Sequence, residues 1–201
     1  MQQVTIVVLY FTGIFLLFLN LACATKPASH PSDYPAELHT FVGRNANILT
    51  YAKADLNGDQ LQDYAVVTEI PYATEQTRKR VLKLLIRNKD HSLRLAKTNH
   101  KIIMCSNCGG IWGDPFVGIT VQDQLIRIEH HGGSNWRWFK SHDFRYSAPE
   151  QSWYLTRVEE HTFTITNPEA VEIRIYTPPK NYGTIDIADF DPEDFLRIHA
   201  N

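Results

Sequence analysis

The sequence predicts a single, mainly β domain of antiparallel strands, arranged as a sandwich or a barrel-like sheet, with a short N-terminal helix and a short C-terminal helix. Short segments of apolar residues, several of them alternating with polar ones, recur along the chain, and turn residues separate them. No long segment with helical periodicity stands between them. A chain of 201 residues, 43% of them hydrophobic, is long and apolar enough to bury one substantial core.

The expected strands follow one another with turns between them. In chain order they are Ile48–Ala54, Asp63–Ile70, Arg80–Arg87, Leu93–Lys97, a hairpin from Phe116 to Ile128 that turns at Asp123-Gln124, Trp136–Tyr146, Trp153–Glu160 and Val171–Tyr176. The polar segment 71–79 is expected to form a loop. Because no helical patterns intervene within this series, the strands are expected to form an antiparallel sheet.

Helix signals occur at the two ends of this strand series. The segment Pro35–Gly43 has proline at its start, an early glutamate and a glycine stop, and Leu38, Phe41 and Val42 form one apolar face. The segment Asp191–Ile198 has an aspartate cap, a proline in the first turn and early acidic residues. We expect the first helix to pack on the sheet as a lid.

The turn between the first two strands has the ligand spacing of a cation site. Asp55, Asn57, Asp59 and Asp63 offer side-chain oxygens from the first, third, fifth and ninth positions, and Leu61 offers a backbone carbonyl from the seventh. Ca²⁺ takes six to eight oxygen ligands and accepts this mixture. The alternative is a plain tight turn, because the Asn-Gly pair tolerates positive φ. The carboxylates favour the cation site, since they repel one another unless a positive charge lies among them.

The segment 55–67 resembles the calcium loop of FG-GAP or VCBS-type repeats, which is also found in integrin-like propeller blades. The resemblance implies a structural Ca²⁺, although Gln60 stands where such loops often carry glycine. A single copy does not predict a full propeller. Segments 108–116, 132–138 and 144–146, together with an amino-terminal signal, resemble a group of uncharacterised exported bacterial proteins, which implies export but no activity.

Residues 1–24 are expected to form an export signal. Val4–Leu19 is almost wholly apolar, and Ala22 and Ala24 fit a cleavage site for small residues. Cys23 offers a second route, because a cysteine after a hydrophobic signal resembles the lipid-accepting residue of bacterial lipoproteins. The third alternative is a retained membrane anchor, since about 17–25 apolar residues can span a bilayer.

All three alternatives place the folded part outside the cytoplasm, either in the periplasm or as a lipoprotein. Because Ala24 after the cysteine is not an aspartate, the resemblance to lipoprotein sorting favours the outer membrane for a lipidated form. Residues 25–34 contain prolines and serines and read as a tether, and residues 35–201 form the globular domain. Membrane association through the Cys23 lipid or the anchor is therefore part of the expectation.

Cys105 and Cys108 permit three interpretations: a local disulfide, a redox-active dithiol, or half of a zinc site completed by His130 and His131. An oxidising compartment favours the disulfide. A redox motif would open a helix in a thioredoxin-like setting, whereas the glycines here indicate a loop. Zinc would require two further ligands whose geometry the sequence does not determine.

His130, His131, Trp136 and Trp138 are the candidates for a ligand surface, because aromatic faces near polar groups bind sugars and peptides. The competing interpretation places these aromatic residues in the core, and strand propensity favours burial. No nucleophile elbow or metalloprotease helix accompanies the histidines. The net charge of −2 supplies no basic patch, which argues against nucleic-acid binding.

Together these features predict an exported, non-catalytic envelope protein with a structural calcium loop and an unknown partner. The rival prediction is an exported enzyme, or a carbohydrate- or peptide-binding module, that uses the aromatic and histidine-rich segment 130–154.

Overall fold

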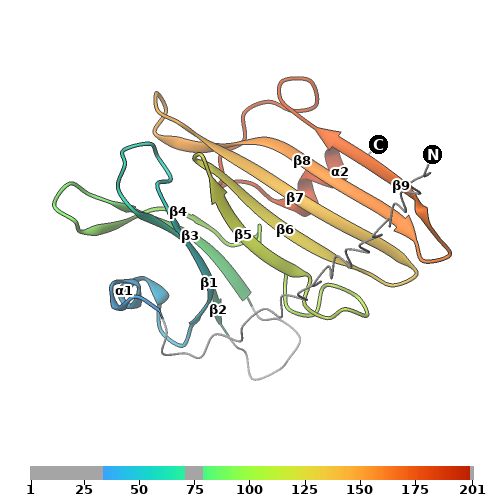
Figure 1. Ribbon diagram of the computed structural model, residues 1–201, viewed down its shortest axis with the longest axis horizontal. Coiled ribbons are helices and arrows are strands. Elements are labelled where there is room, and N and C mark those ends of the chain that lie inside the picture. The colour runs from blue at the N-terminus through green and yellow to red at the C-terminus, as the bar shows by residue number, and fades with distance from the viewer. Residues whose placement is uncertain (1–33, 71–78, 200–201) are drawn as a thin grey trace, which may run out of the picture.

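The computed structural model describes residues 34–70 and 79–199 (Figure 1). Two short helical segments, η1 (Ala36–Leu38) and α1 (His39–Val42), come first, and α2 (Pro192–His199) comes last. Between them run β1 (Asn47–Ala54), β2 (Asp63–Ile70), β3 (Lys79–Arg87), β4 (Leu93–Asn99), β5 (Phe116–Gln122), β6 (Leu125–Gly133), β7 (Trp136–Ser147), β8 (Ser152–Thr164) and β9 (Asn167–Tyr176). The predicted signal segment, Cys23, the tether up to residue 33 and the loop 71–78 lie outside the described residues.

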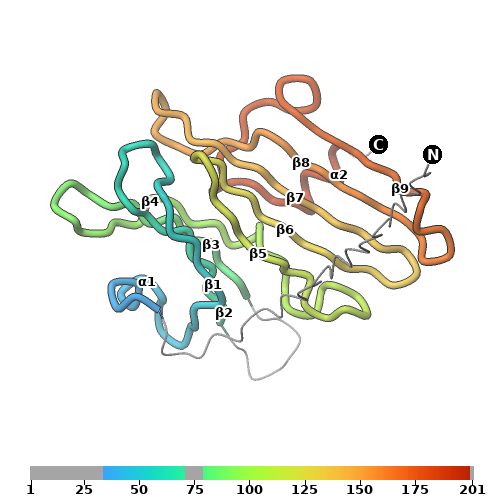
Figure 2. Tube along the Cα trace, viewed as in Figure 1, coloured from blue at the N-terminus to red at the C-terminus, as the bar shows by residue number. Residues whose placement is uncertain are grey.

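The strands form two antiparallel sheets, which confirms the predicted mainly β fold with a short helix near each end. One sheet has four strands in the order β1-β2-β3-β4, and the other has five in the order β5-β6-β7-β8-β9. Within each sheet, strands that are consecutive in the sequence therefore pair with one another, as in a series of hairpins. The chain crosses between the sheets once, in the segment between β4 and β5, which loops past the ends of β6 and β7 (Figure 2).

The longest strands exceed their predicted lengths at a shared end. β8 continues to Thr164 and β9 begins at Asn167, and these two residues pair directly. Most of the residues concerned are polar or exposed, so hydrophobic alternation does not reveal them. The five-stranded sheet consequently extends beyond the residues that the sequence pattern marks as strand.

One apolar core lies between the two sheets. The four-stranded sheet contributes Val67, Leu82 and Leu84, and the five-stranded sheet contributes Ile128 and Phe144, all of them buried. Leu82 and Leu84 occupy alternate positions of β3, so they point to the same face of the pleated sheet. Burial of this shared face stabilises the packing of one sheet on the other.

The opposite face of the four-stranded sheet is covered by the first helix. Leu38 is fully buried against Tyr64 and Leu85, and Phe41 and Val42 pack at the edge of the same cluster. The predicted lid is therefore present. β2 and β3 are buried on both faces. Their sequences are therefore nearly continuous runs of apolar residues and do not alternate strictly between apolar and polar residues.

Candidate metal centre and adjoining pocket

The turn 55–63 joins β1 to β2, and its backbone folds around the side chain of Asp55. Oδ1 of Asp55 accepts hydrogen bonds from the amides of Asn57 at 3.1 Å and Gly58 at 2.7 Å, and Oδ2 accepts one from Gln60 at 2.8 Å. Gln60 has a φ of 67°, in the left-handed region that glycine adopts at lower cost. This left-handed backbone at position 60 is one that favours glycine, although the chain has glutamine there.

Three carboxylates converge in this turn. One oxygen from each of Asp55, Asp59 and Asp63 lies within 4.8 Å of the others. Asn57 and Leu61 lie beside them. The side-chain nitrogen Nδ2 of Asn57 donates to Asp59 Oδ2 at 3.0 Å, and the backbone amide of Leu61 donates to Asp59 Oδ1 at 2.8 Å. The structure therefore gathers the three acidic members of the predicted ligand set, and oxygen donors of this kind suit a hard cation such as Ca²⁺.

Asp63 differs from the other two aspartates because it is completely buried. Its Oδ2 accepts the Leu56 amide at 2.9 Å, and its Oδ1 accepts the Arg87 amide on β3 at 2.7 Å. Burial raises the pKa of this carboxyl, and the charges of Asp59 and Asp55 act in the same direction. Asp63 therefore combines a structural role between two strands with a position in the acidic cluster.

Leu56 connects the turn to the second sheet. Its side chain is fully buried in the core between the sheets, and its carbonyl oxygen accepts the indole N–H of Trp153 on β8 at 2.8 Å. Gly58 approaches the turn between β5 and β6, since a Cβ at this glycine would lie 3.1 Å from the Gln124 side chain. The contact between Leu56 and Trp153 was not predicted from the sequence. The signal that pointed to it was Leu56 itself, an apolar residue within a polar turn.

Cys105 and Cys108 are joined by a disulfide in the crossing segment between β4 and β5. The backbone turns tightly there, because the Cys108 amide donates to the Cys105 carbonyl at 3.2 Å. Sulfurs bonded to one another do not act as thiolate ligands. In this state the pair provides no half-site for zinc.

Arg80 anchors the same crossing segment, and sequence reasoning did not single it out. This β3 side chain is nearly inaccessible, with 1% of its surface exposed, and forms two hydrogen bonds of 2.7 Å to the carboxylate of Asp114. It also donates to the Met104 carbonyl at 3.1 Å and pairs with Glu69 at 2.9 Å. A buried guanidinium satisfied on several sides holds both ends of the loop against the sheet.

The four residues predicted as a ligand surface do not form one surface. His130 is fully buried on the inner face of its sheet, whereas the next residue, His131, faces the other way and contacts Trp112 at a ring distance of 5.5 Å. Trp138 is half-buried under the Lys140 ammonium, which lies 5.3 Å from its ring centroid. The alternation of a strand separates adjacent histidines onto opposite faces.

The aromatic residues of this region divide between core and surface. Trp153 is 2% exposed, as the core interpretation predicts, but Trp136 is 65% exposed and belongs to no core cluster. The expectation of burial is therefore wrong for Trp136. This tryptophan begins β7 at the end of the five-stranded sheet, far along the strand from the core residue Phe144.

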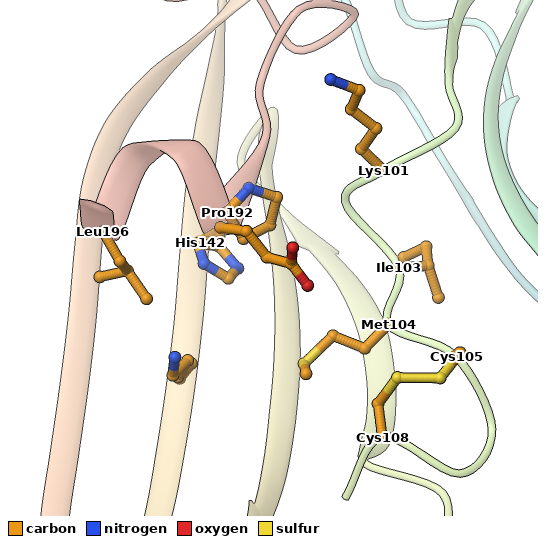
Figure 3. Close-up of a pocket in the computed structure, with 10 residues that line it drawn as sticks. Lys101, Ile103, Met104, Cys105, Cys108, His142, Pro192 and Leu196 are labelled. Atoms are coloured by element: carbon orange, nitrogen blue, oxygen red, sulfur yellow. A yellow bond between two sulfur atoms is a disulfide. The ribbon is translucent and has the colours of Figure 1, made fainter. Parts of the chain in front are cut away.

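A pocket of about 210 Å³ opens between the crossing segment, β7 and α2 (Figure 3). Met104 and the Cys105–Cys108 disulfide line one side, and Leu196 of α2 lines the other. His142 of β7 forms part of the wall beneath the helix. The pocket thus joins three elements that are distant in sequence.

Two buried histidines lie at and behind this wall. The rings of His130 and His142 are 6.1 Å apart, and the Nδ1 atom of each is buried without a hydrogen-bond partner among the described residues. Burial lowers the pKa of His130 to about 4 and places that of His142 well below its usual range. Nε2 of His130 accepts the Met104 amide at 3.3 Å, so the neutral ring carries its proton on Nδ1.

Within residues 34–70 and 79–199, no helix has both the length and the apolar character needed to cross a membrane. The candidate site has two parts: an acidic turn bonded to both sheets, and a pocket with buried histidines at and behind its wall. Comparison of the chain with protein-family models, with curated proteins and with solved structures finds no match.

Proposed function

We propose that this protein is an exported, non-catalytic envelope protein in which a Ca²⁺ ion bound by the turn 55–63 stabilises the β domain. The observation that carries the proposal is the convergence of three carboxylate oxygens within 4.8 Å of one another. Carboxylates this close repel one another in the absence of a cation, and a divalent cation turns that repulsion into attraction.

The structural role of the ion follows from the contacts of the turn. Asp63 holds the amide of Arg87 on β3, and Leu56 holds the indole of Trp153 on β8. A cation that orders Asp55, Asp59 and Asp63 would stabilise the first hairpin together with its contact to the other sheet. Export supplies the compartment, because the apolar segment 4–19 and the cysteine that follows it read as a signal.

We expect Ca²⁺ to raise the melting temperature of the protein relative to the same sample in chelator. Binding to the folded state alone adds about 2.7 kcal/mol when free ligand is about 100 times Kd. For a domain of this size the rise would be about 5–10 °C. Differential scanning calorimetry with Ca²⁺, with Mg²⁺ and with chelator measures it.

Asp59→Asn is the informative variant, because Asp59 is exposed and its loss removes a ligand without opening the core. We expect it to abolish most of the calcium-dependent rise. Asp189→Asn is the matched control, since Asp189 is an exposed aspartate outside the turn. Identical melting temperatures with Ca²⁺ and with chelator would overturn the proposal.

A second candidate function, a binding module for small ligands, is supported by the pocket near α2. Lys140 and His142 belong to the segment 130–154, and both line this pocket. Ile103, Met104 and Leu196 supply apolar walls, which suits a ligand with a short apolar body.

For this candidate we expect hexanoate, used as a probe, to give saturable chemical-shift changes at residues of the pocket in an NMR titration. Leu196→Glu should weaken the interaction about tenfold, because it places a carboxylate against the apolar wall. Ile198→Glu is the control on the same helix, since Ile198 is 60% exposed and does not line this pocket. Equal affinities of the two variants would exclude the pocket as the binding site.

A further inference from the structure

The last strand of the five-stranded sheet has an unpaired edge. β9 pairs with β8 on one side, and no strand in residues 34–70 and 79–199 pairs with its other side. An edge of this kind presents a row of backbone N–H and C=O groups that can pair with another strand. The opposite edge of the sheet differs, because β5 lies against β1 of the other sheet.

β9 is long for an edge strand, and nothing in residues 34–70 and 79–199 covers it. Every residue from Asn167 to Ile175 is exposed. Val171, Ile173 and Ile175 occupy alternate positions on one face and are 42%, 54% and 46% exposed. The strand contains no lysine, and its proline, Pro168, lies near the beginning, away from these residues. An exposed edge with β-branched residues is suited to pairing.

We propose that β9 pairs antiparallel with β9 of a second copy of this chain, across a two-fold axis that passes at Ile173. Residues directly opposite in an antiparallel pair point to the same face. A two-fold axis perpendicular to the joined sheet leaves each residue on the face that it already occupies. The axis must therefore pass through a residue and not between two residues, because otherwise side chains from opposite faces would stand opposite each other. The candidate registers can therefore be enumerated by the residue that faces itself.

The register centred on Ile173 is complementary from Val171 to Ile175. Ile173 then faces its own copy, Val171 faces Ile175, and Glu172 faces Arg174. A register centred on Glu172 sets two glutamates opposite each other, and one centred on Arg174 sets two arginines opposite each other. Opposite charges and β-branched pairs stabilise cross-strand contacts, whereas like charges oppose them.

The charges are available for this contact. Within one copy, Arg174 pairs with Glu172 at 2.7 Å, but the two side chains remain 48% and 56% exposed. An exposed pair of this kind contributes little by itself. In the proposed dimer each arginine lies beside its own Glu172 and opposite that of the second copy, so the strands form a small charge network within one continuous sheet. The contact is isologous and closes at two copies.

Charge reversal in the full-length chain tests the proposal, with sedimentation equilibrium as the measurement. We expect the unmodified chain to dimerise. Glu172→Arg and Arg174→Glu should each weaken the dimer about tenfold or more, because each sets like charges opposite each other twice. The double variant E172R/R174E should restore it, since it exchanges the partners without changing the composition.

Cysteine cross-linking tests the register independently of affinity. A mixture of Val171→Cys chains and Ile175→Cys chains should form a disulfide-linked heterodimer under mild oxidation, whereas either variant alone should cross-link no more than the unmodified chain. A chain that stays monomeric at all concentrations would overturn the proposal. So would single charge variants that dimerise as well as the double variant, or cross-linking that does not depend on mixing.

Discussion

Replacing Asp63 with alanine is expected to lower the free energy of unfolding by about 4 kcal/mol in chelator, where calcium binding plays no part. The substitution leaves the buried amide of Leu56 and the part-buried amide of Arg87 without their acceptors. Each unsatisfied buried donor costs about 1–3 kcal/mol. This loss is a large fraction of the stability of a typical domain, which is about 5–15 kcal/mol. Urea unfolding followed by tryptophan fluorescence measures it.

Asp59→Ala provides the comparison for Asp63→Ala within the same turn. Asp59 also belongs to the acidic cluster, but it is exposed, and its hydrogen bonds to Leu61 and Asn57 can be replaced by water. We expect a change below about 1 kcal/mol in chelator for this variant. Equal losses for the two variants would show that Asp63 does not act as the buried link between β2 and β3.

The stability of the protein is expected to fall steeply as the pH falls from about 6.5 to about 4.5, because two histidines are buried in the neutral form. The unfolded chain takes up protons near the ordinary value of 6.5, whereas the pKa of native His130 is lowered to about 4. The unfolded state therefore binds more protons in this interval, and stability decreases with falling pH. His130 alone would contribute about 2 kcal/mol between pH 6.5 and pH 4.5.

His142 changes stability in the same direction, because burial lowers its pKa as well. Asp63 opposes the two histidines, since burial raises its pKa and the native state gains its proton first as the pH falls. Carboxylates with lowered pKa values, such as Asp186, lose their contribution only below the ordinary range of an aspartate. The interval from pH 6.5 to 4.5 consequently reports mainly the buried histidines.

Urea unfolding at a series of pH values tests this expectation through the slope of stability against pH. His142→Phe should flatten the slope, whether or not it changes the stability at pH 7, because phenylalanine does not titrate. His100→Gln serves as the control, since His100 is exposed in the turn after β4. A slope that is the same in the unmodified chain and in the His142 variant would contradict the assignment.

The strands, the two terminal helices and the acidic turn could be predicted from the sequence because each depends on a local pattern. β2 extends from Asp63 to Ile70, as expected, since an apolar run begins directly after the aspartate-rich turn. α2 begins within one residue of its expected start, because the cap and the proline lie together in the chain. The ligand spacing of Asp55, Asp59 and Asp63 is likewise contained in nine consecutive residues.

Contacts between distant strands depend on register and on sheet packing, which no local pattern determines. Periodicity shows that two residues share a face, but it does not show which face is covered, so Trp153 is buried while Trp136 is exposed. His130 and His142 meet because β6 and β7 pair in one register. The acidic turn could be recognised from the sequence alone. Its hydrogen bond to Trp153 depends on the packing of the two sheets, because Leu56 lies in a turn of one sheet and Trp153 in a strand of the other, 97 residues apart in the sequence.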